Sequence, residues 1–382
     1  MDINSLFKSV FTSEVLATYQ APARVNLIGE HIDYNGGKVL PCAISCYITG
    51  YISKRTDKRI VAYSTSYRDT LSIDLSNIKY IESNSWANYV FGVFAILRQE
   101  GFDVPHGLNI MVDSNIPLGS GLSSSAALLD LILYIANDQF NLGIDLKTIA
   151  RLAQKTENEF CGLKCGIMDQ AAIALGKRNK AILLDCARFT YEYKDIDLGQ
   201  YSFVVLKTNT PRSLVESKYN VRVKECTDAQ NKIKAFCNVD NLSELKAKDL
   251  IRIKSILGNE IEYRRVRHVI TENERVNEFI KALEAKDINA LGQILNESHK
   301  SLKEDYEVTG QYLDTIVEAA LKAGAIGARM TGAGFGGCAI ALIKLSDFET
   351  FKKSVEEYFY EKLHIYPDVF QVDIVDGPKR IN

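Results

Sequence analysis

The feature that most constrains this chain is a glycine- and serine-rich loop between an expected strand and an expected buried helix. The loop, residues 117–125, reads Pro-Leu-Gly-Ser-Gly-Leu-Ser-Ser-Ser. Residues 107–112 alternate like a short strand before it, and residues 126–140 are apolar on nearly every side after it, which predicts a buried helix. Glycines let a ligand approach the backbone closely, and the first N–H groups of a helix lack partners within it. This order therefore favours a phosphate site at the start of the helix.

The loop matches neither of the usual nucleotide-binding motifs. It lacks the Gly-Lys-Ser or Gly-Lys-Thr ending of a P-loop, and its glycines are spaced differently from a dinucleotide-binding fingerprint. A flexible turn capped by serine is the plain alternative for such a loop taken alone. Other segments must therefore decide between the two interpretations.

Composition excludes several classes of protein. A chain of 382 residues is long for one core, so we expect two domains, and the polar stretch before the apolar strand at 201–208 places their boundary between 1–200 and 201–382. The net charge of −2 gives no basic excess for nucleic acid or a membrane surface. The first residues do not resemble a leader and no apolar run could span a bilayer, so we expect a cytoplasmic protein.

The eight cysteines and five histidines argue against soft-metal chemistry. The cysteines have no framework spacing, which in a reducing compartment predicts buried thiols rather than disulfides. Two pairs, Cys42 with Cys46 and Cys161 with Cys165, are four apart, but zinc sites usually have other spacings. No two histidines form a helical metal site, so any metal must be held by oxygen ligands.

A polar cluster lies between two strand-like runs near the N-terminus. Residues 14–29 alternate in short runs broken at Pro22, which predicts strands entering a sheet, and residues 30–37 read Glu-His-Ile-Asp-Tyr-Asn-Gly-Gly. Turn chemistry explains the second half of the cluster but not Glu30 and His31. Carboxylates and imidazole suit the hydroxyls of a neutral polyol, so Glu30, His31 and Asp33 are candidate sugar ligands.

An acid continues the apolar face of a helix expected at 146–160, with Asp145 as its cap. The inward face runs through four apolar residues before the acid, in steps of three and four: Leu146, Ile149, Ala150, Ala153, then Glu157. A buried, unpaired carboxylate is costly. Glu157 therefore needs either a salt-bridge partner or a cation, and both alternatives are open at this point.

Three further residues have both a structural and a functional interpretation. Asp169 lies in the run Cys-Gly-Ile-Met-Asp-Gln with no Lys or Arg within four positions, and such an aspartate usually makes a turn or a cap. Trp86 suits helix packing better than an adenine platform, and Tyr219 is typical of a half-buried packing residue. We interpret the basic run 264–268 as a solvated or salt-bridged helix face rather than a nucleic-acid site.

A second glycine-rich segment, residues 327–338, precedes the strand expected at 339–344. It has four glycines in six residues, at 332–337, and each glycine in an ordered segment costs conformational entropy. A turn or bulge explains one or two of them. Four suggest that this backbone comes very close to another part of the molecule.

These segments together resemble one family of kinases. Residues 117–128 resemble the second motif of the GHMP kinases, residues 327–338 the third, and residues 21–43 the signature of the galactokinases within that superfamily. The motifs occur in the expected order, and the resemblance extends from residue 21 to about 376. The chain departs from the signature at Ala23, usually Gly, and at Ile32, usually Thr.

The resemblance implies an α+β, two-domain GHMP kinase fold. Its N-terminal domain is like ribosomal protein S5 domain 2, its C-terminal domain is ferredoxin-like, and the active site lies in the cleft between them. The implied reaction transfers the γ-phosphoryl group of ATP to the anomeric hydroxyl of D-galactose, giving galactose 1-phosphate and ADP, with Mg²⁺ and as a monomer. The alternatives are an N-acetylgalactosamine kinase and a non-catalytic galactose- and ATP-binding regulator. That regulator lacks the Ser-Ala pair that is intact here at Ser125 and Ala126.

The resemblance also assigns roles to individual residues. Asp169 would accept the proton of the attacking hydroxyl and Arg24 would face the transferred phosphate, on either side of that hydroxyl. The implied sugar-binding residues are Arg24, Glu30, His31, Asp33, Gly166, Asp169 and Tyr219. The implied nucleotide-binding residues are Ser64, Gly119, Ser120, Gly121, Leu122, Ser123, Ser124 and Ser125. The implied Mg²⁺ ligands are Ser125 and Glu157, and Trp86 would lie near the base.

Overall fold

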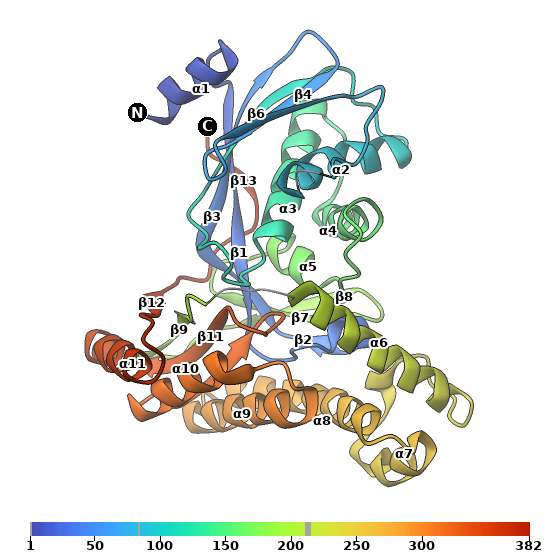
Figure 1. Ribbon diagram of the computed structural model, residues 1–382, viewed down its shortest axis with the longest axis vertical. Helices are drawn as coiled ribbons and strands as arrows, with labels where there is room; N and C mark the ends of the chain where they lie inside the picture. Colours follow the sequence, from blue (N-terminus) through green and yellow to red (C-terminus); the bar gives the residue numbers. More distant parts are fainter. Residues whose placement is uncertain (1, 83–84, 211–214) are drawn as a thin grey trace.

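The protein combines two large β-sheets with helices packed on them, as Figure 1 shows for the computed structural model. The structure describes residues 2–82, 85–210 and 215–382. Mostly antiparallel strands and groups of helices follow one another without a regular βαβ succession. The predicted α+β class is therefore confirmed.

The first sheet has the strand order β13-β1-β3-β6-β4-β5, antiparallel except between β4 and β6. Its strands are β1 (Ala17–Asn26), β3 (Pro41–Lys54), β4 (Arg59–Ser64), β5 (Asp69–Asp74), β6 (Leu108–Ser114) and β13 (Lys379–Arg380). β1 is one continuous strand, so the predicted break at Pro22 is wrong. A register shift between Pro22 and Ala23 accommodates the proline, which cannot donate a ladder hydrogen bond, and pairing with β3 continues on both sides.

Helices cover both faces of this sheet (Figure 1). One face carries α2 (Ser85–Gln99), α3 (Ser124–Phe140), α4 (Leu146–Lys155) and α5 (Met168–Ala174), and the other carries α1 (Ile3–Phe11). The side chains of Phe7 and Phe11 in α1 are buried against Met111 of β6. α3 lies in the middle of its layer, against β1 and β3 and the three neighbouring helices, so the predicted buried helix is confirmed.

α4 begins at its predicted cap, because the Asp145 carboxylate accepts the Thr148 N–H at 3.0 Å. Its inward face is as predicted except at Leu146, which is 41% exposed because the first turn extends beyond the apolar layer. The helix continues as a π-helical turn, Thr156–Phe160. A π turn contains about one more residue than an α turn, yet Glu157 still points inward and is buried.

The second sheet has the order β10-β11-β9-β12 and is fully antiparallel. Its strands are β9 (Tyr201–Lys207), β10 (Gly327–Thr331), β11 (Cys338–Lys344) and β12 (Asp368–Gln371). Figure 1 shows α8 (Glu260–Glu284), α9 (Ile288–Ser301), α10 (Gly310–Lys322) and α11 (Phe348–Leu363) beside it, and α6 (Val215–Lys234) and α7 (Leu250–Leu257) further out. A small sheet of β2 (Lys38–Val39), β7 (Lys180–Asp185) and β8 (Thr190–Asp195) lies between the two.

The basic run on α8 is salt-bridged, as predicted, but it is not solvated throughout. The Arg265 guanidinium is buried, and its N–H groups lie 2.7 Å from both the Glu225 and the Glu307 carboxylates. Arg267 pairs with Asp305. These arginine side chains therefore form ion pairs with acidic side chains of the same protein.

The end of the described chain returns to the first sheet. β13 pairs with β1, with Tyr19 opposite Arg380, and Ile374 forms a bridge with Ile44. The predicted division at residue 200 separates the strands of the two sheets, but the residues after β12 lie with the first one. The boundary stays a prediction, with this segment as its exception.

All eight cysteines are free thiols, and four of them are buried. In the part of the chain that the structure describes, no group of three His, Cys, Asp or Glu side chains is placed to hold a metal ion. None of the described helices combines the length and the apolar character needed to cross a bilayer.

Candidate active site

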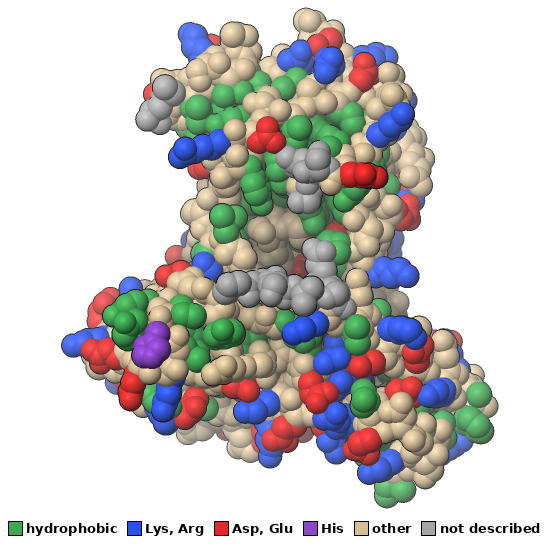
Figure 2. All heavy atoms as spheres, viewed as in Figure 1, with side chains coloured by type: hydrophobic (Ala, Val, Ile, Leu, Met, Phe, Trp, Pro, Cys, Tyr) green, Lys and Arg blue, Asp and Glu red, His purple; other side chains and the backbone are tan. Residues whose placement is uncertain are grey.

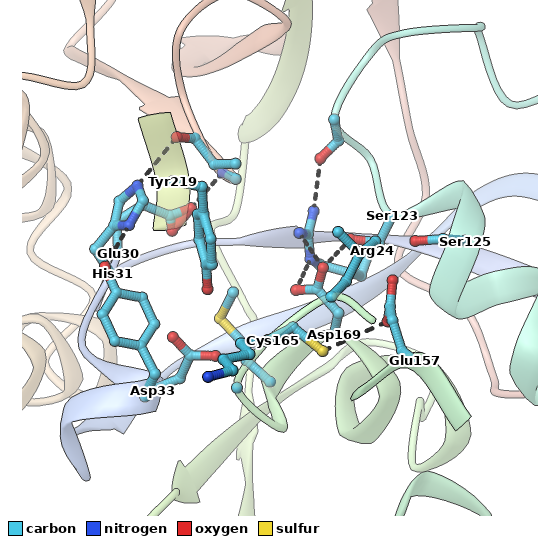
Figure 3. Close-up of a pocket in the computed structure, with 18 of the residues that line it drawn as sticks. Arg24, Glu30, His31, Asp33, Ser123, Ser125, Glu157, Cys165, Asp169 and Tyr219 are labelled. Carbon is cyan, nitrogen blue, oxygen red and sulfur yellow. Dashed lines mark hydrogen bonds and ion pairs between the residues drawn. The ribbon is translucent and has the colours of Figure 1, made fainter. Parts of the chain in front are cut away.

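The candidate site is a pocket where the glycine–serine loop meets segments from both halves of the chain. Figure 2 shows that the molecule is hollowed between its upper and lower parts. The lining comes from the loop, the 30–34 cluster, the 157–169 segment, the start of α6 and the loop after β10. Figure 3 shows that the labelled side chains of Glu30, Asp33 and Tyr219 group on one side and those of Arg24 and Glu157 on the other. The sequence-predicted residues are therefore largely brought together.

The loop has the conformation that its glycines suggested. Gly119 and Gly121 have φ values of 66° and 77°, and α3 begins at Ser124. Ser123, the residue before the helix, makes no side-chain capping bond, and its hydroxyl donates instead to the Asp169 carboxylate. The alternative of a serine-capped turn is therefore wrong for Ser123, because the acid competes for that hydroxyl.

The second glycine-rich segment lies directly against this loop, as its composition suggested. A β-carbon on Gly332 would lie only 2.8 Å from the Gly121 carbonyl oxygen. One on Gly334 would lie 2.3 Å from the Val308 carbonyl oxygen. Both contacts are closer than real β-carbons allow, so glycine is required at these two positions. The loop after β10 thus packs against the glycine–serine loop from the other half of the chain.

Arg24 and Asp169 form a two-pronged ion pair at the centre of the pocket. Nε and Nη2 of Arg24 lie 2.7 Å from the two Asp169 oxygens, and Nη1 donates to the Gly121 carbonyl at 2.9 Å. Burial alone would lower the pKa of the Arg24 guanidinium, but the adjacent Asp169 carboxylate raises it above its usual value. The sequence reasoning placed the two groups on either side of a hydroxyl. The structure brings the two groups into direct contact, so that the buried guanidinium has an adjacent carboxylate, and their placement about the hydroxyl stays a prediction.

The Glu30 carboxylate is held in place by hydrogen bonds and an ion pair with neighbouring residues. It accepts from the Asn26 amide at 2.7 Å and from the Gly332 N–H, and Arg329 lies 3.5 Å away. Burial raises the pKa of its carboxyl, while the Arg329 charge opposes that shift. Its Oε1 also accepts from the Thr331 hydroxyl at 3.4 Å, and because a carboxylate oxygen can accept about two hydrogen bonds, only Oε2 retains capacity for a ligand hydroxyl.

Asp33 lies against the backbone of Gly166. A β-carbon at Gly166 would be 1.8 Å from Asp33 Oδ2, so only glycine lets this carboxylate occupy its place. Burial, and after it the charge of Asp169, raises the pKa of Asp33 to about 7. The absence of a side chain at Gly166 therefore leaves space for the Asp33 carboxylate.

Aromatic rings close the end of the pocket that holds Glu30 and Asp33. The ring centre of Tyr219, from α6, lies 5.7 Å from that of His31 and 5.5 Å from that of Tyr34. Both nitrogens of His31 have protein partners, Tyr34 Oη at 2.9 Å and the Ala333 carbonyl at 3.1 Å. The sequence reasoning treated His31 as free to bind a hydroxyl and did not foresee these contacts.

Glu157 and Ser125 both line the pocket. Gln170 donates to the Glu157 carboxylate at 2.5 Å. Burial, and then the charge of Asp169, raises the pKa of Glu157 to about 7, and hydrogen bonds beginning with that from Ser125 offset part of this shift. Within residues 2–82, 85–210 and 215–382, no Lys or Arg lies within 4 Å of Glu157. The salt-bridge alternative is thus unsupported in the described residues, and a cation at Glu157 stays a prediction.

Besides Leu122, whose side chain is buried and is not among the described residues of the lining, two residues predicted near the nucleotide lie apart from the pocket lining. Ser64 is not among the described residues that form this lining, and its buried hydroxyl accepts the Tyr67 N–H at 3.3 Å. Trp86 is buried and stacks on Tyr67, with ring centres 6.2 Å apart and planes at 7°. Both side chains have structural explanations. Their nucleotide roles stay predictions.

The two departures from the galactokinase signature are both buried. Ala23 lies in β1, and the Ile32 side chain fills the space against Gly37, where a β-carbon would meet it at 2.8 Å. Neither is among the described residues that line the pocket. Their main consequence is therefore in core packing.

Several lining residues were not singled out from the sequence. Lys164 and Asn220 are polar and exposed, and Gly332 and Ala333 contribute backbone. Lys164 was detectable in principle, because it lies between Glu157 and Gly166 in a segment already assigned to the site. Asn220 follows Tyr219 on α6, and nothing in the sequence around Tyr219 indicated that the next residue also lines the pocket.

The loop, the segment that supports it and the central ion pair define a small-molecule kinase of the GHMP class. Family models agree: "GHMP kinases N terminal domain" matches residues 88–177, "GHMP kinases C terminal" residues 279–361, and "Galactokinase galactose-binding signature" residues 5–54. The chain belongs to the galactokinase family of this class.

Relatives and solved structures support this assignment over the whole chain. A galactokinase of Ligilactobacillus salivarius is 43% identical, covering 99% of this chain and 98% of the relative, and one of Clostridium acetobutylicum is 40% identical, covering 100% and 98%. The Lactococcus lactis galactokinase complexed with galactose superposes with a TM-score of 0.95 at 39% identity, covering 99% of this chain and 98% of that one. A Methanococcus jannaschii mevalonate kinase, at 21% identity and a TM-score of 0.65 over 94% and 98%, shares the fold.

Proposed function

We propose that the protein transfers the γ-phosphoryl group of ATP to the anomeric hydroxyl of D-galactose, giving galactose 1-phosphate and ADP for galactose catabolism. The observation that carries this proposal is the Arg24–Asp169 pair, which bonds to the glycine–serine loop at Gly121 and Ser123 and lines the same pocket as the polar cluster. The solved Lactococcus lactis relative, which holds galactose, supports the choice of sugar.

The phosphate loop provides the nucleotide site in this proposal. The first N–H groups of α3 and the positive end of its dipole attract the ATP phosphates, with the 119–125 backbone around them. Asp169 accepts the proton of the anomeric hydroxyl, and Arg24, which pairs with that carboxylate, faces the charge of the transferred group. Because phosphoryl transfer leaves little covalent work to the protein, positioning and charge account for most of the catalysis.

The sugar binds at the other end of the pocket. Glu30 and Asp33 pair with hydroxyls, Asp169 and Arg24 lie at the anomeric position, and Gly166 gives Asp33 its place. His31 and Tyr219 complete the wall that faces the sugar.

Ser125 and Glu157 fit a hard divalent cation. A hydroxyl and a buried carboxylate are the ligand types that Mg²⁺ prefers, and Mg²⁺ usually completes its shell with water and substrate phosphates. When bound, the ion would supply positive charge that offsets the charge of the ATP phosphates. Ser125 and Glu157 would hold it beside the loop.

We expect Glu157→Gln to raise the Mg²⁺ concentration needed for ATP binding by about tenfold or more, because the amide keeps the shape but removes the charge. Titrating Mg²⁺ against a fluorescent ATP analogue measures this without turnover. Galactose affinity serves as the internal control and is expected to stay within about twofold. An unchanged Mg²⁺ titration would remove Glu157 from the metal site.

A sugar panel tests the proposed function. In an ATP-consumption assay, galactose is expected to react and glucose to be rejected by up to ~10⁴-fold, because the wrong epimer leaves buried polar groups unpaired. Asp33→Asn should reduce the ratio of the galactose rate to the glucose rate, since it removes the charge that pairs with a sugar hydroxyl. Equal rates for glucose and galactose would contradict the assignment, and preference for N-acetylgalactosamine would replace it. Absence of ATP consumption with every sugar, despite galactose binding, would indicate the non-catalytic regulator.

A cytoplasmic monomer is part of this proposal. Eight free thiols suit a reducing compartment. Light scattering of the purified protein tests the monomeric state.

A further inference from the structure

A chain of hydrogen bonds runs from the sugar-facing wall into the second half of the molecule. It links His31 Nδ1 to Tyr34 Oη at 2.9 Å, Tyr34 Oη to Tyr306 Oη at 2.8 Å, and Tyr306 Oη to Cys226 Sγ at 3.1 Å. The other His31 nitrogen, Nε2, lies 3.1 Å from the Ala333 carbonyl oxygen. Neither the sequence reasoning nor the proposed reaction uses this chain.

The direction of each hydrogen bond follows from one fixed acceptor. The Ala333 carbonyl can only accept, so Nε2 of His31 carries the proton and donates it. In the neutral ring, Nδ1 must then accept from the Tyr34 hydroxyl. The Tyr34 oxygen accepts in turn from Tyr306, whose oxygen accepts the Cys226 S–H. All the bonds therefore run in one direction.

Packing holds this chain rigidly. Tyr306 is fully buried, and its ring centre lies 5.0 Å from that of His31 and 4.5 Å from that of His268. His268 is itself fixed, since it donates to the Glu30 carbonyl at 3.0 Å and accepts from Ser301 at 2.9 Å. Burial lowers the pKa of His31 to about 3 and that of His268 to about 4, so both imidazoles are neutral near pH 7.

We propose that Tyr34 and Tyr306 are positioning residues for sugar recognition, which lock His31 in its Nε2–H form as a wall of the sugar pocket. This proposal rests on the proposed galactokinase function. With both ring nitrogens occupied, the His31 ring shapes the pocket, and hydroxyl pairing falls to Glu30 and Asp33. Figure 3 shows the His31 ring beside Glu30 and facing Tyr219.

The chain also connects sugar recognition to the second half of the protein. Cys226 comes from α6 and Tyr306 ends the turn after α9, whereas His31 and Tyr34 belong to the first half. The phosphate loop makes none of these hydrogen bonds. Breaking the chain should therefore weaken sugar binding more than ATP binding.

The test compares Tyr34→Phe and Tyr306→Phe with the wild-type protein by calorimetric titration of galactose and, separately, of ATP. One lost hydrogen bond predicts a galactose affinity about three- to tenfold weaker in each variant. ATP affinity should stay within about twofold. Tyr312→Phe, which removes an exposed hydroxyl on α10, is the matched control and should bind both ligands like wild type.

Nitrogen NMR of labelled histidines gives a readout that a merely structural role would not move. The protein has only five histidines, so the His31 signals can be assigned by mutation. In wild type at pH 7, Nε2 should be protonated and Nδ1 should be a hydrogen-bonded acceptor. In Tyr34→Phe, the Nδ1 signal should shift toward that of a free imidazole nitrogen, or the proton should move to Nδ1.

Two results would overturn the proposal. One is unchanged galactose affinity together with unchanged His31 signals in both variants. The other is an equal loss of galactose and ATP affinity, which would indicate general disruption of the fold. If wild type did not bind galactose, the proposed function would fail, but the nitrogen signals need no sugar and would still decide whether the chain fixes His31.

Discussion

Asp169→Asn is expected to slow phosphoryl transfer by at least about 100-fold while galactose and ATP still bind. The anomeric hydroxyl must lose its proton by the time the new bond to phosphorus is complete. The Asp169 carboxylate, which is paired with Arg24, is the proposed acceptor, and an amide cannot take that proton.

The structure indicates why binding should survive this change. Asparagine has the same shape, and its carbonyl can still accept one N–H of Arg24 or the Ser123 hydroxyl. The buried Arg24 charge loses half of its two-pronged partner, so some loss of stability is also expected. Thermal unfolding of the variant measures that loss separately.

Single-turnover kinetics beside calorimetric galactose binding separates the two effects. Arg24→Ala should lose turnover as well, with ATP affinity only modestly weaker. Asp228→Asn, which removes a surface carboxylate paired with Lys224, is the matched control and should behave like wild type. If Asp169→Asn turned over within a few-fold of wild type, Asp169 would have no role in accepting the proton.

Gly166→Ala is expected to weaken galactose binding by about tenfold to 100-fold. The added methyl group would lie 1.8 Å from Asp33 Oδ2, so the carboxylate or the 163–166 backbone must move. Overpacking of this kind typically costs about 1–3 kcal/mol, and here the displaced group is a proposed sugar ligand.

Galactose binding is again measured by calorimetric titration. ATP is titrated in parallel as a control, because an added β-carbon at Gly166 would clash with Asp33 and not with the glycine–serine loop. Gly162→Ala is the control, because its β-carbon would meet open space and it reports only the strain of a positive φ, here 78°. Galactose affinity unchanged by Gly166→Ala would show that Asp33 can move without loss, and it would cease to be a sugar ligand.

Local patterns predicted the elements around the site well. The strand, glycine loop and apolar helix at 107–140 follow from periodicity and glycine placement, and the structure confirms them as β6 and α3. The four glycines at 332–337 predicted a close approach, and Gly332 against Gly121 is that approach. These signals are local because backbone conformation and burial leave their mark on adjacent residues.

Contacts between distant residues could not be predicted in the same way. Asp169 has no basic neighbour in sequence, so its pairing with Arg24 depends on how α5 is placed against β1. His31 and Tyr34 have hydrogen-bond partners at 333 and 306, respectively, far along the sequence. Leu146 fits the helical period, but its side chain lies outside the apolar layer. The reason is that periodicity does not show where such a layer ends.

The return of β13 to the first sheet bears on how the protein is synthesised. β1 pairs with β3 early in the chain, but positions 18–20 on its other edge are covered only after residues 379–381 have been synthesised. Until then the nascent protein exposes unpaired N–H and C=O groups along that edge, which is the kind of surface that recruits strands from other chains. The second half of the molecule must therefore be translated before the first half is protected against aggregation, and chaperone demand should be highest during that interval.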